Sequence, residues 1–169
     1  MAVDWFLFRI GPGKFGTEDV DASLCSHYIY AFAILDPKLF TIVPQDEAND
    51  VSNGSYIKFT SLKKKYPALK TMIAIGGAVD SKSDKYSLLV SDDRKVKVFI
   101  QSVLHFLDKF KFDGIDVDWE FPKTSADKIG FSNLLKALKQ HLKPRGYLLT
   151  TAVSAYRPTI DQGKVSIDY

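Results

Sequence analysis

The sequence predicts a mainly parallel α/β sheet, and three observations support that class. First, four short runs are rich in β-branched and aromatic residues, at residues 27–35, 70–75, 112–121 and 147–153. Second, the stretches between these runs place apolar residues three and four positions apart, which is typical of amphipathic helices. Third, the runs begin roughly 40 residues apart, about the length of one large β-α unit. A strand followed by a helix, repeated along the chain, favours parallel pairing.

Turn-forming residues bound each predicted strand. The long connection after the first strand is expected to form a small hairpin at residues 39–43. The bounding residues are Asp36-Pro37 after the first strand, Gly76-Gly77 after the second, Pro122 after the third and Gly146 before the fourth.

Two helices are predicted with clear ends. Residues 92–110 carry a helical apolar stripe, with Ser91 or Asp92 as the N-cap. Residues 125–142 carry another, and Pro144 prevents its continuation. The pattern at residues 51–65 is weaker but also helical. No linker rich in Pro, Gly or Ser divides the chain, so residues 1–169 are expected to form one domain.

Composition and charge exclude several classes of protein. The 169 residues carry a net charge of +3 with both signs interspersed, so the chain lacks the basic stripe of a nucleic-acid binder. The longest apolar run, residues 28–35, is too short to cross a bilayer. His27, His105 and His141 lie far apart, so neither a metal site nor a cofactor is expected. Cys25 is the single cysteine and is expected to be a small buried residue.

The run FDGIDVDWEF at residues 112–121 places several carboxylates in a predicted strand, where Asp is depleted. Because side chains alternate along a strand, Asp116, Asp118 and Glu120 are expected to share one face. An antiparallel strand with one wet face would also explain them. However, the neighbouring runs predict parallel strands, which are normally covered on both faces. Pro122 ends the strand and places Glu120 at its carboxyl end, where α/β enzymes keep their active sites.

Like charges this close together are expected to change how the carboxyl groups titrate. Neighbours two apart on a strand lie about 7 Å apart, so each ionised pair costs roughly 2 kcal/mol at an effective dielectric of about 20. In a sheltered cleft at least one group is therefore expected to keep its proton near neutral pH. A general acid requires a carboxyl group that keeps its proton near pH 7.

The same run resembles the DxxDxDxE signature of the family-18 glycoside hydrolases, which include chitinases and chitinase-like lectins; it reads Asp113-Gly114-Ile115-Asp116-Val117-Asp118-Trp119-Glu120. Other stretches agree in order and spacing. Residues 24–33 resemble the family's second strand, 69–77 its third and 149–154 its fifth, and Asp4-Trp5 resembles the loop after its first strand. The resemblance implies an α/β fold, namely an incomplete TIM (β/α)8 barrel with roughly strands 2 to 5 and the helices between them. Residues 1–169 would then be part of a family-18 catalytic domain.

The resemblance also implies a reaction, the substrate-assisted retaining hydrolysis of β-1,4 N-acetylglucosamine linkages in chitin or its oligosaccharides, without a cofactor. Glu120 would protonate the glycosidic oxygen and later activate water. Asp118 would hold the 2-acetamido group, whose carbonyl oxygen attacks the anomeric carbon. Asp116 would bias the charge and orientation of Asp118. Because many relatives are secreted, the resemblance implies an extracellular location.

Further positions match the family in supporting roles. Asp113 and Gly114 are expected to be structural. Trp5 and Phe32 are expected to stack on sugar faces, although packing in the core would explain them as well. Gly76 and Gly77 are expected at the floor of the cleft, although any turn after a strand would also explain them. Ala152 completes the expected substrate-binding set, which is Trp5, Phe32, Gly76, Gly77 and Ala152.

The chain departs from the family pattern in three ways. Position 78 is alanine, where many relatives carry a tryptophan that stacks on sugar. Only residues 1–3 precede the Asp4-Trp5 match, and the cysteine that pairs with the Cys25 position in many relatives is missing. The second half of the barrel is also absent. A barrel removes its edges only by closing, so the chain is expected to be a fragment that aggregates or dimerises on its own.

Two other functions stay open. A non-catalytic chitin-binding lectin would share the fold, although such relatives usually replace one of the acidic residues. A dinucleotide-binding oxidoreductase is the remote alternative, because residues 11–16 match GxGxxG and Asp36 lies 20 residues beyond Gly16. Pro12 restricts that turn, and residues 17–26 are barely long enough for the helix that must follow.

Overall fold

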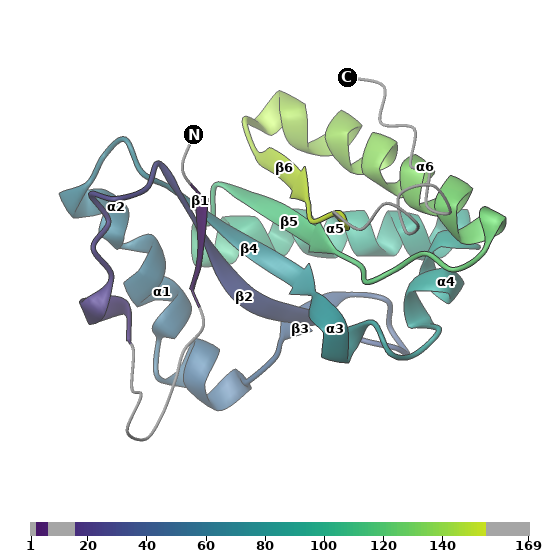
Figure 1. Ribbon diagram of the computed structural model, residues 1–169, viewed down its shortest axis with the longest axis horizontal. Coiled ribbons are helices and arrows are strands. Elements are labelled where there is room, and N and C mark those ends of the chain that lie inside the picture. The colour runs from purple at the N-terminus through teal and green to yellow at the C-terminus, as the bar shows by residue number, and fades with distance from the viewer. Residues whose placement is uncertain (1–2, 7–15, 155–169) are drawn as a thin grey trace.

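The computed structural model describes residues 3–6 and 16–154. Five parallel strands form one open sheet in the order β1-β2-β4-β5-β6, and the short strand β3 pairs antiparallel with β2 (Figure 1). The strands are β1 (Val3–Phe6), β2 (His27–Leu35), β3 (Ile42–Pro44), β4 (Lys70–Gly76), β5 (Gly114–Asp118) and β6 (Leu148–Thr151).

The predicted parallel α/β sheet is confirmed, with three differences. Asp4 and Trp5 lie in strand β1, not in a loop after a strand, because β1 pairs in parallel register with the start of β2. The expected hairpin is present, and its two strands are β2 and β3. Because β3 lies at Ile42–Pro44, it overlaps the predicted residues 39–43 only in part. The predicted strand at residues 112–121 is shortened to β5, whose last pairing joins Asp118 to Gly76.

The two long helices are confirmed, and their caps are those the sequence favours. Helix α5 (Asp93–Phe110) begins after Asp92, whose side chain accepts a hydrogen bond from the Arg94 N–H at 2.9 Å. Helix α6 (Ser125–Leu142) begins after Thr124 with a reciprocal capping box to Asp127. None of the helices in the described part of the chain is long and apolar enough to cross a membrane.

The shorter helical segments were predicted less well. The single helix expected at residues 51–65 is divided, because Gly54 adopts a left-handed conformation with φ +75°. The segments there are the π-helical turn η3 (Ala48–Ser52), α1 (Ser55–Thr60) and α2 (Leu62–Lys65). Two short helices beyond β4 were not predicted, α3 (Gly77–Asp80) and α4 (Lys85–Val90), and the 3-10 turns are η2 (Thr17–Asp19) and η4 (Lys143–Arg145).

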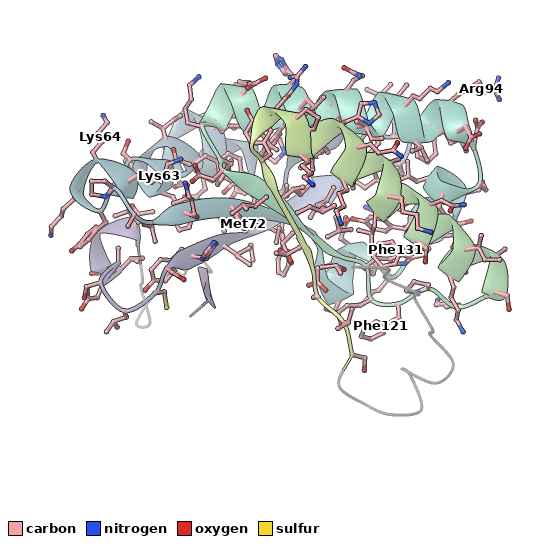
Figure 2. The ribbon with its side chains drawn as sticks, turned by 90° about the horizontal axis from the view of Figure 1, so that it is seen from above. Lys63, Lys64, Met72, Arg94, Phe121 and Phe131 are labelled. Carbon is pink, nitrogen blue, oxygen red and sulfur yellow. The ribbon has the colours of Figure 1, made fainter. Side chains whose placement is uncertain are left out.

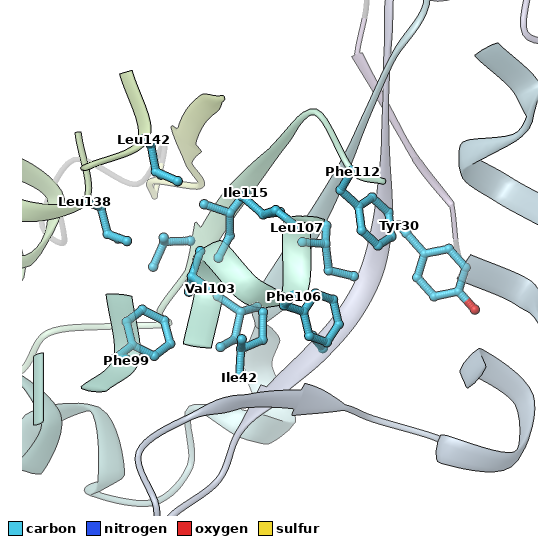
Figure 3. Packing of buried hydrophobic residues seen from close by; sticks show 14 of the residues in the cluster. Tyr30, Ile42, Phe99, Val103, Phe106, Leu107, Phe112, Ile115, Leu138 and Leu142 are labelled. Atoms are coloured by element: carbon cyan, nitrogen blue, oxygen red, sulfur yellow. The ribbon is translucent and has the colours of Figure 1, made fainter. Parts of the chain in front are cut away.

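The main hydrophobic core lies between the helices and one face of the sheet, and Figure 1 shows α5 crossing behind β4 and β5. In Figure 3 the α5 side chains Phe99, Val103 and Leu107 face the sheet residue Ile115. Phe131 of α6, labelled in Figure 2, packs edge-on against Trp119 at 5.4 Å between ring centroids. Cys25 is half-buried at the margin of this core, not fully buried as expected.

The opposite face of the sheet carries a smaller apolar cluster and the acidic residues. This cluster, the inner-face cluster, consists of Ile29, Ala31, Met72 and Ala74, with Phe32 and Leu148 partly buried against it. Asp116 and Asp118 alternate with Ile115 and Val117 along β5, so the two aspartates lie on the inner face and the two apolar residues in the main core. The predicted alternation of β5 is therefore confirmed for these four residues.

Asp113 and Gly114 lie at the opposite end of β5 from Asp118. The Asp113 Oδ2 atom accepts hydrogen bonds from Lys63 Nζ at 2.8 Å and from the Thr71 N–H at 2.8 Å. These bonds tie the start of β5 to α2 and β4. Gly114 passes so close to β6 that a Cβ atom there would lie 2.3 Å from the Leu148 carbonyl oxygen.

We expect Gly114→Ala to destabilise the protein by about 2–3 kcal/mol, because the new methyl group can avoid the Leu148 carbonyl only by separating β5 from β6. The matched control is Gly54→Ala, where the Cβ meets no atom within 4 Å and only the left-handed φ is strained. That control should cost about 1 kcal/mol. Urea denaturation of both variants measures the difference, and equal losses would contradict the close packing of β5 on β6.

Candidate active site

Two carboxyl groups lie buried on the inner face at the carboxyl end of β5. Asp116 is 3% exposed and Asp118 is 5% exposed, and such deep burial is rare for acidic residues. Glu120 is half-buried and lies two residues beyond the strand, in a bend, so strand alternation does not fix its position as the sequence predicted. The charge of Glu120 nevertheless raises the pKa of Asp118.

Only one of the two carboxyl oxygens of Asp116 has a hydrogen-bond partner among the described residues. The Thr150 hydroxyl donates to Asp116 Oδ1, from the position on β6 that pairs with Asp116 in the parallel ladder. Asp116 Oδ2 is fully buried and has no hydrogen-bond partner among the described residues. Burial raises the pKa of this carboxyl group, and the Thr150 bond opposes that shift only in part.

Asp118 has the clearest change in acidity. Its pKa is raised from 3.8 to about 6, first by burial, then by the charge of Glu120 and then by that of Asp116. The sequence predicted that at least one carboxyl group of this cluster keeps its proton near neutral pH, and the raised pKa values of Asp118 and Asp116 agree with that prediction. The main physical cause is that the two aspartates are buried on a strand.

Gly76 fixes the backbone of Asp118. It pairs with Asp118 at the end of the β4–β5 ladder and has φ +117°, which side chains of L-residues rarely tolerate. A Cβ atom at Gly76 would lie 2.2 Å from the Asp118 carbonyl oxygen. The sequence placed Gly76 at a cleft floor or an ordinary turn; the structure adds that its missing side chain lets β4 approach Asp118.

A cavity of about 730 Å³ lies beside this contact, at the carboxyl ends of β2 and β4. Phe32, Gly76 and Gly77 line it, and a Cβ atom at Gly77 would touch the Phe32 ring at 3.0 Å. Its lining, within the described part of the chain, includes neither Asp118 nor Glu120. The sequence did not predict its polar side, which comes from the connection after β3 and the segment after α3 and includes Gln45, Asp46, Asn49, Lys82 and Ser83.

The segment after β4 also contains polar residues that sequence reasoning missed. The buried Ser81 hydroxyl accepts a hydrogen bond from the Glu120 N–H at 3.0 Å. Asp80 forms a buried ion pair with Lys85 and accepts a hydrogen bond from the Tyr86 hydroxyl at 2.7 Å. The only available signal was a run of polar residues shortly after Gly76-Gly77, which by itself is typical of any surface loop.

The remaining predicted positions are Ala152, next to Thr151, which pairs with Val117 of β5, and Trp5. Ala152 follows the end of β6 and is half-buried. Only the backbone of Trp5 is described, in β1. The GxGxxG match at residues 11–16 falls mostly outside the described residues, and the short turn η2 is the only helical element at residues 16–26. Asp36 accepts hydrogen bonds from the Lys38 and Leu39 N–H groups in a turn.

Comparison with known proteins gives a consistent result. The family model described as "Glycosyl hydrolases family 18" matches residues 5–169. "Probable chitinase 10" of Drosophila melanogaster is 41% identical over 169 residues, covering 95% of this chain and 7% of that protein. "Probable chitinase 2" of the same species is 37% identical over 166 residues, covering 94% of this chain and 34% of that protein.

A solved structure extends the match to three dimensions. A mutant of Group II chitinase catalytic domain 2 from Ostrinia furnacalis, in complex with (NAG)5, is 37% identical with a TM-score of 0.90. The match covers 95% of this chain and 45% of that one. The chain therefore spans less than half the length of each of these similar proteins, and its open sheet corresponds to part of their fold.

The raised pKa of Asp118 predicts a pH-dependent stability. When a carboxyl group has a higher pKa in the folded state than in the unfolded state, the folded protein binds more protons at pH values between the two. The protein therefore loses stability as pH rises from about 4 to about 6. Asp118→Asn removes this loss. We compare the free energy of unfolding of the variant with that of wild type at each pH. The difference, variant minus wild type, is expected to be larger at pH 7 than at pH 4 by about 1–2 kcal/mol, after allowance for solvent screening.

Denaturant titrations at pH 4 and pH 7 on both proteins measure this effect. The exposed Asp84→Asn makes the same chemical change at the surface and serves as the matched control. A constant difference between Asp118→Asn and wild type at both pH values would contradict the raised pKa.

Proposed function

The chain belongs to glycosyl hydrolase family 18, and from that premise we propose that it supplies the acid-bearing part of a chitinase-type hydrolase. The proposed substrate is a β-1,4-linked N-acetylglucosamine chain, as in chitin or its oligosaccharides. The observation that supports the proposal is that Asp118 and Asp116 are buried at the carboxyl end of a parallel strand, where the charge of Glu120 raises the pKa of Asp118. Burial of a carboxyl group costs free energy, and titratable groups with shifted pKa values concentrate at functional sites, so this arrangement favours catalysis.

In the proposed reaction Glu120 donates a proton to the glycosidic oxygen as its bond to the anomeric carbon breaks. The carbonyl oxygen of the substrate's own acetamido group forms the new bond to that carbon, which gives a cyclic oxazolinium ion. Water then attacks the same carbon, and Glu120 takes up the proton that the water releases. The configuration of the anomeric carbon is retained, because each of the two displacements inverts it.

Asp118 and Asp116 are proposed to stabilise the positive charge of this intermediate. Burial raises the pKa of both groups, so the pair keeps a proton to a higher pH than exposed aspartates do. In its ionised form Asp118 can accept a hydrogen bond from the acetamido N–H. A carboxylate in a site of low dielectric stabilises an adjacent cation far more than one in water does.

The cavity beside Phe32 is proposed to bind further sugar units. Its aromatic side offers a stacking surface, and its polar side offers partners for hydroxyl and acetamido groups. Ala78 also lines the cavity and provides no aromatic surface. Tyr30, the other aromatic residue in the described lining, is buried, so stacking would rest on Phe32. The structure of the Ostrinia furnacalis relative in complex with (NAG)5 supports an oligosaccharide as ligand. An extracellular location, and partners that are neither nucleic acid nor membrane, complete the proposal.

A non-catalytic chitin-binding lectin is the second candidate. The observation that favours it is that the cavity lining includes none of Asp116, Asp118 and Glu120 among the described residues. A sugar chain could therefore bind beside Phe32 without engaging the acidic groups. Binding of chitin without release of sugar would identify this function.

We expect Glu120→Gln to lower the release of sugar from N-acetylglucosamine oligosaccharides by at least about 100-fold, because the amide cannot donate the proton. Retention on insoluble chitin should be unchanged. The matched control is Glu47→Gln, which changes an exposed glutamate in the same way and should leave turnover intact.

Both variants are compared with wild type in the complete protein that contains this chain, with oligosaccharide products measured by chromatography. Turnover that survives Glu120→Gln would exclude Glu120 as the acid. Retention on chitin with no turnover in wild type would favour the lectin.

A further inference from the structure

The backbone of Glu120 is held by a contact that strand pairing does not provide. The β4–β5 ladder ends at Asp118, so the N–H of Glu120, two residues later, has no strand partner. The Ser81 Oγ atom accepts this N–H at 3.0 Å. Ser81 is separated from Glu120 by 39 positions in the sequence and is only 3% exposed.

The Ser81 hydroxyl bonds to the backbone of the residue before Trp119 and of the residue after it. A hydroxyl group has one hydrogen to donate and two lone pairs to accept with. While it accepts from the Glu120 N–H, the same oxygen lies 3.5 Å from the carbonyl oxygen of Asp118, to which it donates. One side chain therefore bonds to the backbone of both acidic residues.

Ser81 and its neighbours are also held in place. The Ser81 N–H donates to the carbonyl oxygen of Gly77, the first residue of α3, at 3.0 Å. The preceding residue, Asp80, accepts a hydrogen bond from the Tyr86 hydroxyl at 2.7 Å, and the Tyr86 ring stacks on Trp119, with ring centroids 5.6 Å apart and an interplanar angle of 23°. The segment that follows β4 thus contacts residues 118–120 in two ways. Its Tyr86 stacks on the ring of Trp119, and its Ser81 bonds to the backbone of the residues on either side.

We infer that Ser81 is a positioning residue for Glu120: its hydroxyl sets the backbone from which the acid reaches the glycosidic oxygen. The inference rests on the proposed function. Glu120 lies in a bend, and none of the described strands pairs with it, so the loss of this bond lets the carboxyl group move relative to the substrate. A displacement of about 1 Å at a reacting group lowers the rate by about 100-fold.

The test separates a misplaced acid from a damaged fold by comparing two substrates. An N-acetylglucosamine oligosaccharide has a poor leaving group and needs the proton from Glu120, whereas the dinitrophenyl glycoside of the same sugar needs none. We expect Ser81→Ala to lower the rate about 100-fold on the oligosaccharide but less than about tenfold on the dinitrophenyl glycoside. The ratio of the two rates does not depend on the fraction of enzyme that is folded.

Three further variants of the complete protein sharpen the comparison. Ser81→Cys has a similar size but is a weak acceptor, and it should change the ratio as Ser81→Ala does. Ser81→Thr keeps the hydroxyl and should restore the wild-type ratio. Ser125→Ala removes an exposed hydroxyl at the start of α6 and is the control, with no change expected.

Two results would overturn the inference, and they are distinguishable. An unchanged ratio in both Ser81→Ala and Ser81→Cys, with wild type active on both substrates, excludes Ser81 as a positioning residue and leaves the proposed function intact. Wild type that hydrolyses neither substrate contradicts the proposed function and this role together.

Discussion

The pairing of β4 with β5, which ends where Gly76 meets the carbonyl oxygen of Asp118, is the contact on which the rest of the structure depends. It orders β5 between two parallel strands, so that Asp116 and Asp118 are directed to the inner face and the intervening residues to the main core. It also ends the strand at Asp118, and Glu120 follows in a bend beside Ser81. A side chain at position 76 would separate the two strands at this point.

The two faces of the sheet have different physical tasks. The face covered by α5 and α6 buries a large apolar cluster, which stabilises the fold through the removal of hydrocarbon from water. The inner face buries few apolar residues and two carboxyl groups, one of which has an oxygen without a partner among the described residues. Burial of these two carboxyl groups disfavours their ionised forms, which is why the pKa values of Asp116 and Asp118 are raised.

The sequence was sufficient to predict the parallel sheet, the long helices with their ends, and the alternation along β5, because periodicity and capping are local properties. It failed where a contact joined distant segments. The early end of β5 depends on Gly76, the position of Glu120 depends on Ser81, and the acidity of Asp118 depends on burial. The division of the helix at Gly54 required its left-handed φ, which a lone glycine permits but does not dictate.

A carboxyl-carbon NMR titration of Asp118 tests the central claim, that burial and neighbouring acids tune this group. The predicted result is a midpoint at about pH 6 in wild type, with a lower midpoint in Glu120→Gln, because one of the charges that raise the Asp118 pKa is then absent. A wild-type midpoint near the ordinary value of 3.8, unchanged in the variant, would contradict the account.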